Sequence, residues 1–391
     1  MPPFSLLLKP TSADCNLRCD YCFYLKNRSL YPETKTHRMS DEVLRAVIKS
    51  YMATDQPVYQ MTWQGGEPTL MGKAFFEKVV ACQKQFARKG ARIANSLQTN
   101  AVRITDGLAA HLGRYRFLAG CSLDGPPEMH DRRRRTVGGK PTHARVLDGI
   151  RTLRSNRVLV NALVLITREN AGKPLELYRY LKRQGFAHLQ FVPCVEFDDV
   201  GDPLPFALDA KSWGRFLIAV FNEWYERDLG RISVRTFESL LYRLATGGDA
   251  ECRLAKRCDK YFVVEYNGDI YPCDFFVDPR FKIGNILEMT WEEARSSEVY
   301  QRFAALKSER SDACGECRYL SFCLGDCLKY RMAFGNDPRT LSWLCPGWKR
   351  FYDATMDRFK DLAADVVRGG MNGRQGQENE RISEETTPRT E

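Results

Sequence analysis

Residues 13–23 read Ala-Asp-Cys-Asn-Leu-Arg-Cys-Asp-Tyr-Cys-Phe, which places Cys15, Cys19 and Cys22 in a C-x3-C-x2-C spacing just after the apolar run 4–8. Three thiolates leave one iron of a cubane iron–sulfur cluster without a protein ligand, and an open metal position can bind a substrate or cofactor. A structural zinc knuckle is the alternative, but zinc would be one ligand short, since His37 lies fifteen residues past Cys22. The spacing therefore favours an iron–sulfur cluster with one open iron.

A second set of cysteines occupies the C-terminal part of the chain. It comprises eight of the fourteen cysteines: Cys252, Cys258, Cys273, Cys314, Cys317, Cys323, Cys327 and Cys345. Eight thiolates can complete two four-ligand clusters, and fully ligated clusters suit electron transfer rather than substrate binding. A pair of zinc sites is the alternative, because zinc also accepts four thiolates. The remaining Cys82, Cys121 and Cys194 lie in helical or apolar stretches and are expected to be buried as small hydrophobic side chains.

Apolar runs alternate with helical patterns up to residue 227. The apolar runs cover 4–8, 58–63, 92–98, 117–123, 158–166 and 188–193, and the helical patterns cover 41–53, 73–89, 105–113, 142–155, 172–184 and 210–227. Six such units predict a parallel barrel, in which ligands gather at the C-terminal ends of the strands. The cysteine triad follows the first strand and Gly65-Gly66-Glu67-Pro68 follows the second, so both should lie at that end. Glycines allow close backbone approach to a ligand, and the Glu67 carboxylate can receive an ammonium group.

Length and composition indicate a packed protein with about two domains. The chain has 391 residues, is 43% hydrophobic and shows no secretory signal and no run able to span a bilayer, which predicts a soluble cytoplasmic protein without a membrane partner. In that compartment the cysteines are expected to be metal ligands rather than disulfides. The formal net charge of +10 falls to about +5 once three clusters are counted, which argues against a nucleic-acid partner. The run 132–135 of four arginines is either a phosphate clamp or a solvated surface loop.

These motifs resemble those of a known enzyme class. The triad, with Tyr21 before its last cysteine, and the Gly-Gly-Glu-Pro segment resemble the signature of the radical S-adenosylmethionine (SAM) enzymes. The second cysteine set resembles the SPASM extension of members that modify peptides. The resemblance implies an α/β fold, with a partial (β/α)6 TIM-type barrel followed by a cysteine-rich domain. The implied cofactors are three 4Fe-4S clusters and SAM, which the reduced cluster cleaves to a 5′-deoxyadenosyl radical.

The same resemblance implies a role for individual residues. Cys252, Cys258, Cys273 and Cys327 would hold the first auxiliary cluster, and Cys314, Cys317, Cys323 and Cys345 would hold the second. The implied SAM contacts are Tyr21, Gly66, Ser122, Arg134 and Val195. Arg134 comes from the pattern His130-Asp131-x-x-Arg134, and four consecutive arginines leave Arg135 as an alternative.

Asp274 follows a cluster cysteine in Pro272-Cys273-Asp274. Such a residue can simply cap a turn. The whole constellation, however, resembles the anaerobic sulfatase-maturating enzymes over residues 1 to about 350, and there this aspartate is a general base. The resemblance implies that the radical removes a hydrogen from the β-carbon of a sulfatase Cys or Ser, giving formylglycine. The implied partners are a sulfatase polypeptide with a Cys/Ser-x-Pro-x-Arg motif and an electron donor such as ferredoxin or flavodoxin.

The predicted domains are a radical SAM barrel at 1–235, a SPASM domain at 236–366 and a disordered polar tail at 367–391. The second domain is expected to hold fewer regular elements, because clusters would organise it. Two other functions stay open at this point. One is a SPASM enzyme that forms a thioether or carbon–carbon crosslink in a ribosomal peptide, and the other is a zinc-binding adaptor.

Overall fold

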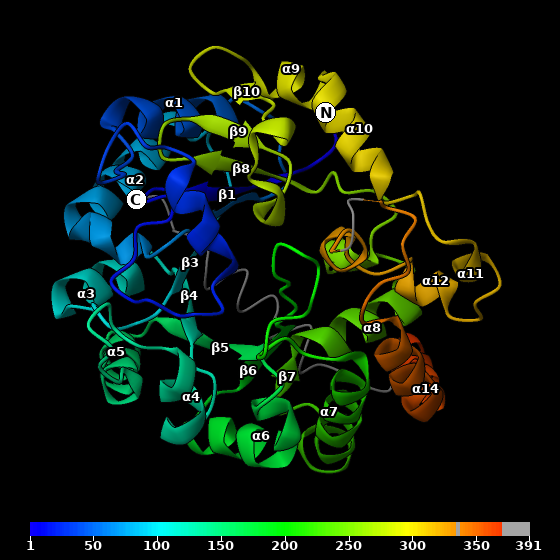
Figure 1. Cartoon of the computed structure of the whole chain (residues 1–391). Helices are drawn as coiled ribbons and strands as arrows, with labels where there is room; N and C mark the ends of the chain where they lie inside the picture. Colours follow the sequence, from blue (N-terminus) through cyan, green and yellow to red (C-terminus); the bar gives the residue numbers. More distant parts are fainter. Residues whose placement is uncertain (334–336, 370–391) are drawn as a thin grey trace.

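The fold is organised by one curved, ten-stranded sheet. The computed structural model describes residues 1–333 and 337–369, without the side chain of Lys26. The strand order is β10-β9-β8-β1-β2-β3-β4-β5-β6-β7, and all neighbours from β8 to β7 in this order pair in parallel. Figure 1 shows the sheet curving from β10 to β7 with the larger helices on its outer side. This is the expected partial barrel.

Six strand–helix units form the barrel wall. The strands are β1 (Ser5–Lys9), β2 (Tyr59–Trp63), β3 (Ile93–Thr99), β4 (Leu118–Ser122), β5 (Leu159–Ile166) and β6 (His188–Pro193). The helices that cover them are α1 (Asp41–Met52), α2 (Gly72–Phe86), α3 (Asp106–Arg114), α5 (His143–Ser155), α6 (Pro174–Arg183) and α7 (Ala210–Glu223). Each predicted unit is thus confirmed to within a few residues. A short helix, α4 (Pro127–Arg133), was not predicted.

Local signals in the sequence fix where several helices begin. Ser40, Thr105 and Asp209 precede α1, α3 and α7, and each side chain accepts a backbone N–H of the first helical turn. The opposite, apolar faces of the helices then pack on the sheet. Val47 of α1 and Phe76 of α2, for example, are fully buried in the same core as Trp63 of β2. Buried apolar contacts therefore hold these helices against the sheet.

The sheet continues past the six units at both edges. β7 (Ser233–Val234) extends it beyond β6, and β8 (Tyr261–Glu265), β9 (Asp269–Tyr271) and β10 (Gly284–Asn285) extend it beyond β1. β8 runs alongside the whole of β1, from Ser5 opposite Tyr261 to Lys9 opposite Glu265. This pairing joins the C-terminal cysteine-rich segment to the first barrel strand.

The C-terminal segment is more regular than expected. It contains α8 (Arg235–Thr246), α9 (Trp291–Ser296), α10 (Glu298–Leu306), α11 (Asp312–Gly315), α12 (Leu320–Cys323), α13 (Leu328–Arg331) and α14 (Cys345–Val367). α14 packs against α7, where the rings of Phe359 and Phe221 lie 4.6 Å apart. The prediction of few regular elements is therefore wrong, because an apolar core as well as the cysteines organises this segment.

The chain after α14 is described only to residue 369. The predicted tail began at 367, so its first residue ends α14 and its residues 370–391 lie outside the described residues. Across the described part of the chain, no helix is both long and apolar enough to cross a membrane.

Candidate active site

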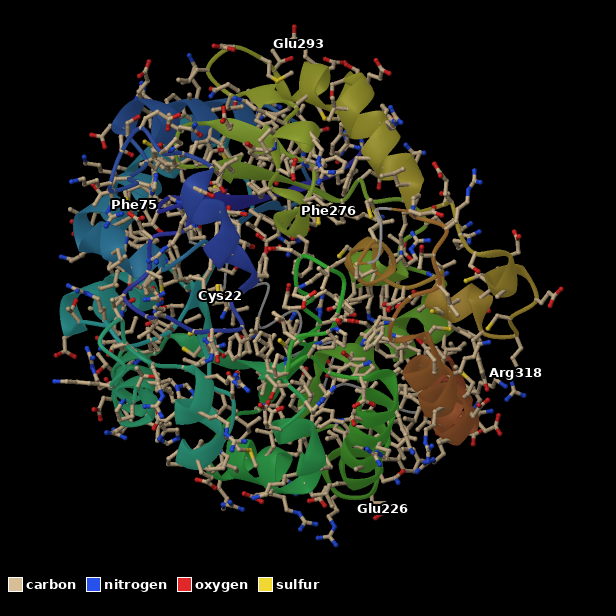
Figure 2. All side chains as sticks on the ribbon, viewed as in Figure 1. Cys22, Phe75, Glu226, Phe276, Glu293 and Arg318 are labelled. Carbon is tan, nitrogen blue, oxygen red and sulfur yellow. The ribbon has the colours of Figure 1, made fainter. Side chains whose placement is uncertain are left out.

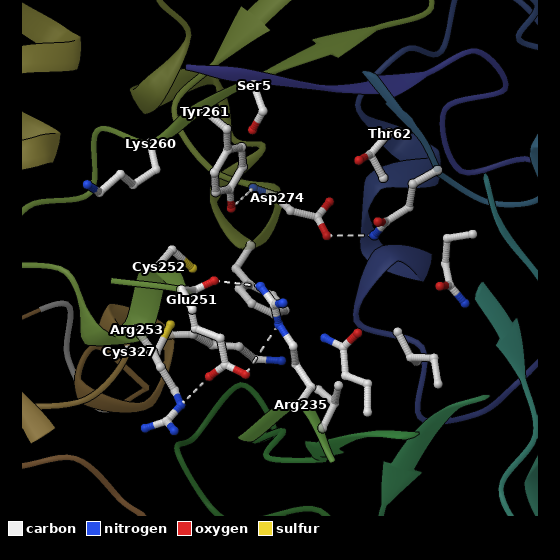
Figure 3. A pocket seen from close by; sticks show the side chains of 18 of the residues that line it. Ser5, Thr62, Arg235, Glu251, Cys252, Arg253, Lys260, Tyr261, Asp274 and Cys327 are labelled. Atoms are coloured by element: carbon white, nitrogen blue, oxygen red, sulfur yellow. Dashed lines mark hydrogen bonds and ion pairs between the residues drawn. The ribbon is translucent and has the colours of Figure 1, made fainter. Parts of the chain in front are cut away.

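A cavity of about 1120 Å³ lies on the inner side of the curved sheet. Segments from all parts of the chain line it, including Tyr21, Gln64, Gln98, Ser122, Cys252, Asp274 and Cys327. Figure 3 shows Asp274, Tyr261, Cys252 and Cys327 around this space. The fold thus joins the segments that the sequence marked as SAM site, base and auxiliary cluster.

The cysteine triad lies on a loop after β1, held against the loop after β2. The backbone N–H groups of Gly66 and Glu67 donate to the carbonyls of Ser12 and Asp14 at 2.6 and 2.8 Å. A Cβ on Gly66 would stand 2.0 Å from the Asp14 oxygen, so a larger residue would force the two loops apart. Gly66 therefore positions the cysteine loop. Figure 2 shows Cys22 of this loop toward the inner side of the barrel.

The three triad thiols lie close enough to influence one another electrostatically. Burial raises the pKa of Cys15 and of Cys19 to about 12. Such thiols stay protonated at neutral pH by themselves, whereas a bound metal deprotonates them outright. In the described residues no three His, Cys, Asp or Glu side chains converge tightly enough for a single metal ion. A cubane takes one thiolate on each iron, so three thiols on one loop match in number a cluster with one open iron.

Glu67 makes several hydrogen bonds within the protein. It is fully buried, and its carboxylate accepts hydrogen bonds from Thr69, from the Thr99 hydroxyl at 2.7 Å and from the Asn100 N–H at 2.7 Å. These bonds tie the loops after β2 and β3 together. Glu67 thus has a structural role that was not expected, and its contact with an ammonium group stays a prediction.

Arg134 is the buried member of the four consecutive arginines, being 8% exposed. Its Nε donates to Asp124 Oδ2 at 2.7 Å, and the same carboxylate accepts the Tyr21 hydroxyl. Burial by itself lowers the pKa of Arg134, but the Asp124 carboxylate beside it raises that pKa well above its usual value. Arg135, by contrast, is exposed and donates to the Gly139 carbonyl. The fold therefore places Arg134, and not Arg135, beside Tyr21 and Cys19.

The barrel interior near Arg134 and Asp124 contains a buried hydrogen-bond acceptor that no protein group among the described residues uses. Asn161 Oδ1 is buried and has no hydrogen-bond partner in the described part of the chain. A Cβ on Gly120 would lie 3.0 Å from that oxygen and 2.2 Å from Gln98 Oε1, so glycine keeps this space clear. Gln98 donates to Ser122 Oγ at 3.2 Å, and the buried Val195 follows β6. Acceptors around a cleared space fit the hydroxyl groups of a nucleoside such as that of SAM.

The eight downstream cysteines separate into two groups in space. Cys252, Cys258 and Cys273 each interact electrostatically with Cys327. Cys345 interacts with Cys314, Cys317 and Cys323, and these four line one small, separate pocket. The interleaved grouping is the one that the resemblance implied. All fourteen cysteines are free thiols.

Asp274 is 8% exposed and is held by side chains from the barrel. Its Oδ1 pairs with the Lys9 ammonium at the end of β1, and its Oδ2 accepts from Gln64 Nε2 at 2.9 Å. The Lys9 nitrogen lies 3.8 Å from the centre of the Tyr24 ring, and the Tyr24 hydroxyl donates to the buried Glu265. These contacts fix the carboxylate at the cavity wall and do not match a turn cap.

Sequence reasoning missed the partners that orient these groups. In the sequence, Lys9 and Gln64 are ordinary polar residues at strand ends. The only hint of a role was their position, Lys9 shortly before the cysteine triad and Gln64 directly before Gly65-Gly66-Glu67-Pro68. Asp124 lies just after β4, and no motif marked it as the partner of Tyr21 and Arg134. Cys121 and Cys194 are buried, as expected, whereas Cys82 is only half-buried.

Comparison with known proteins defines the class first. The radical SAM superfamily profile matches residues 10–181, and the SPASM profile, an iron–sulfur cluster-binding domain, matches residues 252–318. The chain is thus a radical SAM enzyme with an iron–sulfur extension, and it uses SAM and 4Fe-4S clusters as cofactors.

The full-length relatives narrow this class. The chain is 34% identical to a serine-type anaerobic sulfatase-maturating enzyme of Bacteroides thetaiotaomicron, over 90% of this chain and 89% of the relative. It is also 34% identical to a cysteine-type enzyme of Clostridium perfringens, over 94% of this chain and all of the relative. A solved structure described as native anSMEcpe with bound AdoMet and Kp18Cys peptide superposes with a TM-score of 0.87 at 33% identity, covering 93% of this chain and 100% of that chain. The chain belongs to the family of anaerobic sulfatase-maturating enzymes.

Proposed function

We propose that this enzyme oxidises a Cys or Ser side chain in a sulfatase polypeptide to formylglycine. The observation that carries this proposal is the single cavity whose wall contains Tyr21, Ser122, Asp274, Cys252 and Cys327. A peptide side chain in that space would face a SAM site, a carboxylate and an auxiliary-cluster segment together. Simple oxidation needs a radical source, a proton acceptor and an electron acceptor, and each has a candidate here.

The cofactor sites follow from the residues present. Cys15, Cys19 and Cys22 would hold the cluster with the open iron, and Tyr21, Gly66, Ser122, Arg134 and Val195 would surround SAM. Bound SAM supplies a 5′-deoxyadenosyl radical, which takes a hydrogen atom from the substrate β-carbon. The guanidinium of Arg134, oriented by Asp124, suits the SAM carboxylate because charged hydrogen bonds of this kind are short and directional.

Asp274 is the proposed general base. Lys9 and Gln64 hold one oxygen each, and a carboxylate oxygen has a second lone pair with which it can accept the substrate proton. Asp274 would take the thiol or hydroxyl proton as the substrate radical gives one electron to an auxiliary cluster. A cysteine then yields a thioaldehyde, which water converts to the aldehyde with loss of H₂S, and a serine yields the aldehyde directly.

The auxiliary ligand sets are proposed as Cys252, Cys258, Cys273 and Cys327 for the first cluster and Cys314, Cys317, Cys323 and Cys345 for the second. Cys252 and Cys327 line the cavity, so the first set is the nearer acceptor for the substrate electron. The domain boundaries at 235 and 366 are part of the same proposal.

The proposed partners are a sulfatase segment with Cys/Ser-x-Pro-x-Arg and a small electron donor such as ferredoxin or flavodoxin. A cytoplasmic location is inferred from the fourteen free thiols, which suit a reducing compartment. Formation of a thioether or carbon–carbon crosslink is the alternative reaction. The full-length similarity to sulfatase-maturating enzymes of both types favours oxidation over crosslinking.

The test is mass spectrometry of two peptides that differ only in Cys or Ser at the target position. Each is incubated anaerobically with reconstituted enzyme, SAM and reductant, in parallel with Asp274→Asn. An aldehyde at the target residue, lost in the variant, supports the proposal. Cleavage of SAM with both peptides unchanged, or a crosslinked product, would overturn it.

A further inference from the structure

Two buried cations lie among the auxiliary cysteines, and the buried Asp326 carboxylate interacts electrostatically with both of them. Lys307 follows α10 and Arg331 ends α13, and each side chain is 1% exposed. Among the described residues, neither forms an ion pair with an acidic side chain. Two buried cations against this one carboxylate leave a positive charge that is costly to bury, so a further anion is expected at this place.

Lys307 lies at the first auxiliary group. Its Nζ donates to the carbonyl of Arg253 at 3.0 Å and to that of Asp326, which are the neighbours in sequence of Cys252 and Cys327. The Cys258 N–H donates to the carbonyl of Ala304 on the same helix at 3.2 Å. The end of α10 therefore contacts the segments of three ligands of the proposed first cluster.

Arg331 lies between the two groups. Its guanidinium donates to the carbonyls of Glu309 at 2.8 Å and Lys307 at 3.0 Å. It interacts electrostatically with Cys258 and Cys327 of the first group, with Cys314 of the second and with the Asp326 carboxylate. Both side chains thus use neutral carbonyls for their hydrogen bonds, and Asp326 offsets only part of their combined positive charge.

The proposed auxiliary clusters would supply that further negative charge. A cubane with four thiolates carries a net charge of about −2 when oxidised. Accepting one electron makes that charge more negative by one. A buried cation nearby stabilises the reduced form more than the oxidised form, and net charge around a cluster is one of the factors that set its potential.

We propose that Lys307 and Arg331 are the buried counter-charges of the auxiliary clusters and raise their reduction potentials, so that these clusters accept the electron released by the substrate. This inference rests on the proposed function and on its auxiliary ligand sets. In the step itself, the β-carbon loses a hydrogen atom to the adenosyl radical, Asp274 takes the proton, and an auxiliary cluster takes the remaining electron. Lys307 and Arg331 act through the cluster and are positioning residues.

The test is an EPR-monitored redox titration of the anaerobically reconstituted full chain. Cys15, Cys19 and Cys22 are replaced by alanine in every sample, so that only auxiliary signals are read. Lys307→Gln keeps a donor for the two carbonyls but removes the charge, and Lys307→Arg keeps the charge. Arg331→Gln and Arg331→Lys form the second pair, and Arg302→Met, on the exposed face of α10, is the control.

We expect Lys307→Gln to lower the reduction equilibrium constant of one auxiliary cluster at least tenfold, a shift of 59 mV for one electron. Arg331→Gln should lower the reduction equilibrium constants of both auxiliary clusters. The variants that keep a charge, and Arg302→Met, should stay within threefold of the parent. Iron and sulfide contents are measured on each sample, and if Arg331→Gln loses iron the Lys307 pair still decides the question.

Unshifted potentials at full iron content in Lys307→Gln would overturn the counter-charge role alone. Absence of both auxiliary signals in the parent protein would overturn the proposed ligand sets as well. The two proposals therefore fail in distinguishable ways.

Discussion

The ion pair between Lys9 and Asp274 should be essential to the stability of the site as well as to its chemistry. Lys9 is fully buried and Asp274 is 8% exposed, so Lys9→Met leaves a carboxylate inside the protein without its cation. Breaking a buried pair by removing one partner costs about 3–5 kcal/mol. That is a large part of the roughly 5–15 kcal/mol that stabilises a typical folded protein. Lys9→Met is therefore expected to be markedly less stable and inactive.

The charge explanation makes a sharper prediction for the double variant. Lys9→Met with Asp274→Asn places an amide where the unpaired carboxylate would be, so part of the lost stability should return while activity does not. The rest should stay lost, because Lys9 also interacts electrostatically with the buried Glu265 carboxylate. The assay is anaerobic urea unfolding of reconstituted enzyme, followed by circular dichroism. Lys78→Met removes one side of the solvent-exposed pair with Asp41 and serves as the control, with an expected cost below about 1 kcal/mol. The reasoning is refuted if Lys9→Met costs no more than the control, or if the double variant is no more stable than Lys9→Met.

Three further predictions concern the triad loop and the arginine motif. Replacing the triad cysteines together with alanine should remove about one third of the iron and all SAM cleavage, measured by iron analysis and chromatography, because the other clusters have their own ligands. Gly66→Ala should lose the same cluster, because the new Cβ would stand 2.0 Å from a backbone oxygen. Gly172→Ala, whose Cβ would meet nothing within 4 Å, should keep the cluster. Equal iron contents in the two variants would contradict this prediction. Burial lowers the pKa of His130 from 6.5 to about 3. The unfolded chain therefore binds this proton more readily below pH 6.5, and stability should fall as the pH drops through that range. The free energy of unfolding is measured at pH 7.5 and at pH 5.5. It should fall less between these two pH values in His130→Asn than in the parent, and an equal fall would show that His130 is not responsible.

The barrel could be predicted from the sequence because its signals are local. Each strand is a short apolar run and each covering helix has its own periodicity, so the six units needed no knowledge of long-range contacts. The edge strands β7 and β10 have only two residues each and carry no such pattern. β8 does carry a local signal that was missed, an apolar run followed by the turn Asn267-Gly268. Its pairing with β1, more than 250 residues earlier in the chain, could not be read from the sequence.

The candidate site likewise has a part that the sequence predicts and a part that depends on long-range packing. Cysteine spacing and the motif around Arg134 were readable, and the fold brings those residues together. The role of Glu67 could not be read, because whether a carboxylate faces a ligand or bonds to neighbouring loops depends on the packing of β2 against β3. The roles of Lys9, Lys307 and Arg331 could not be predicted either. Lys9 is distinguished by its buried ion pair with Asp274, and Lys307 and Arg331 by burial without an ion pair among the described residues, and both features depend on the fold.

The most direct test of the central claim follows one hydrogen atom. A target peptide with deuterium on the β-carbon of its Cys is incubated anaerobically with enzyme and unlabelled SAM, and the 5′-deoxyadenosine is analysed by mass spectrometry. Abstraction from the β-carbon predicts one deuterium in the 5′-deoxyadenosine for each formylglycine formed in a single turnover. Formylglycine accompanied by unlabelled 5′-deoxyadenosine would contradict the account.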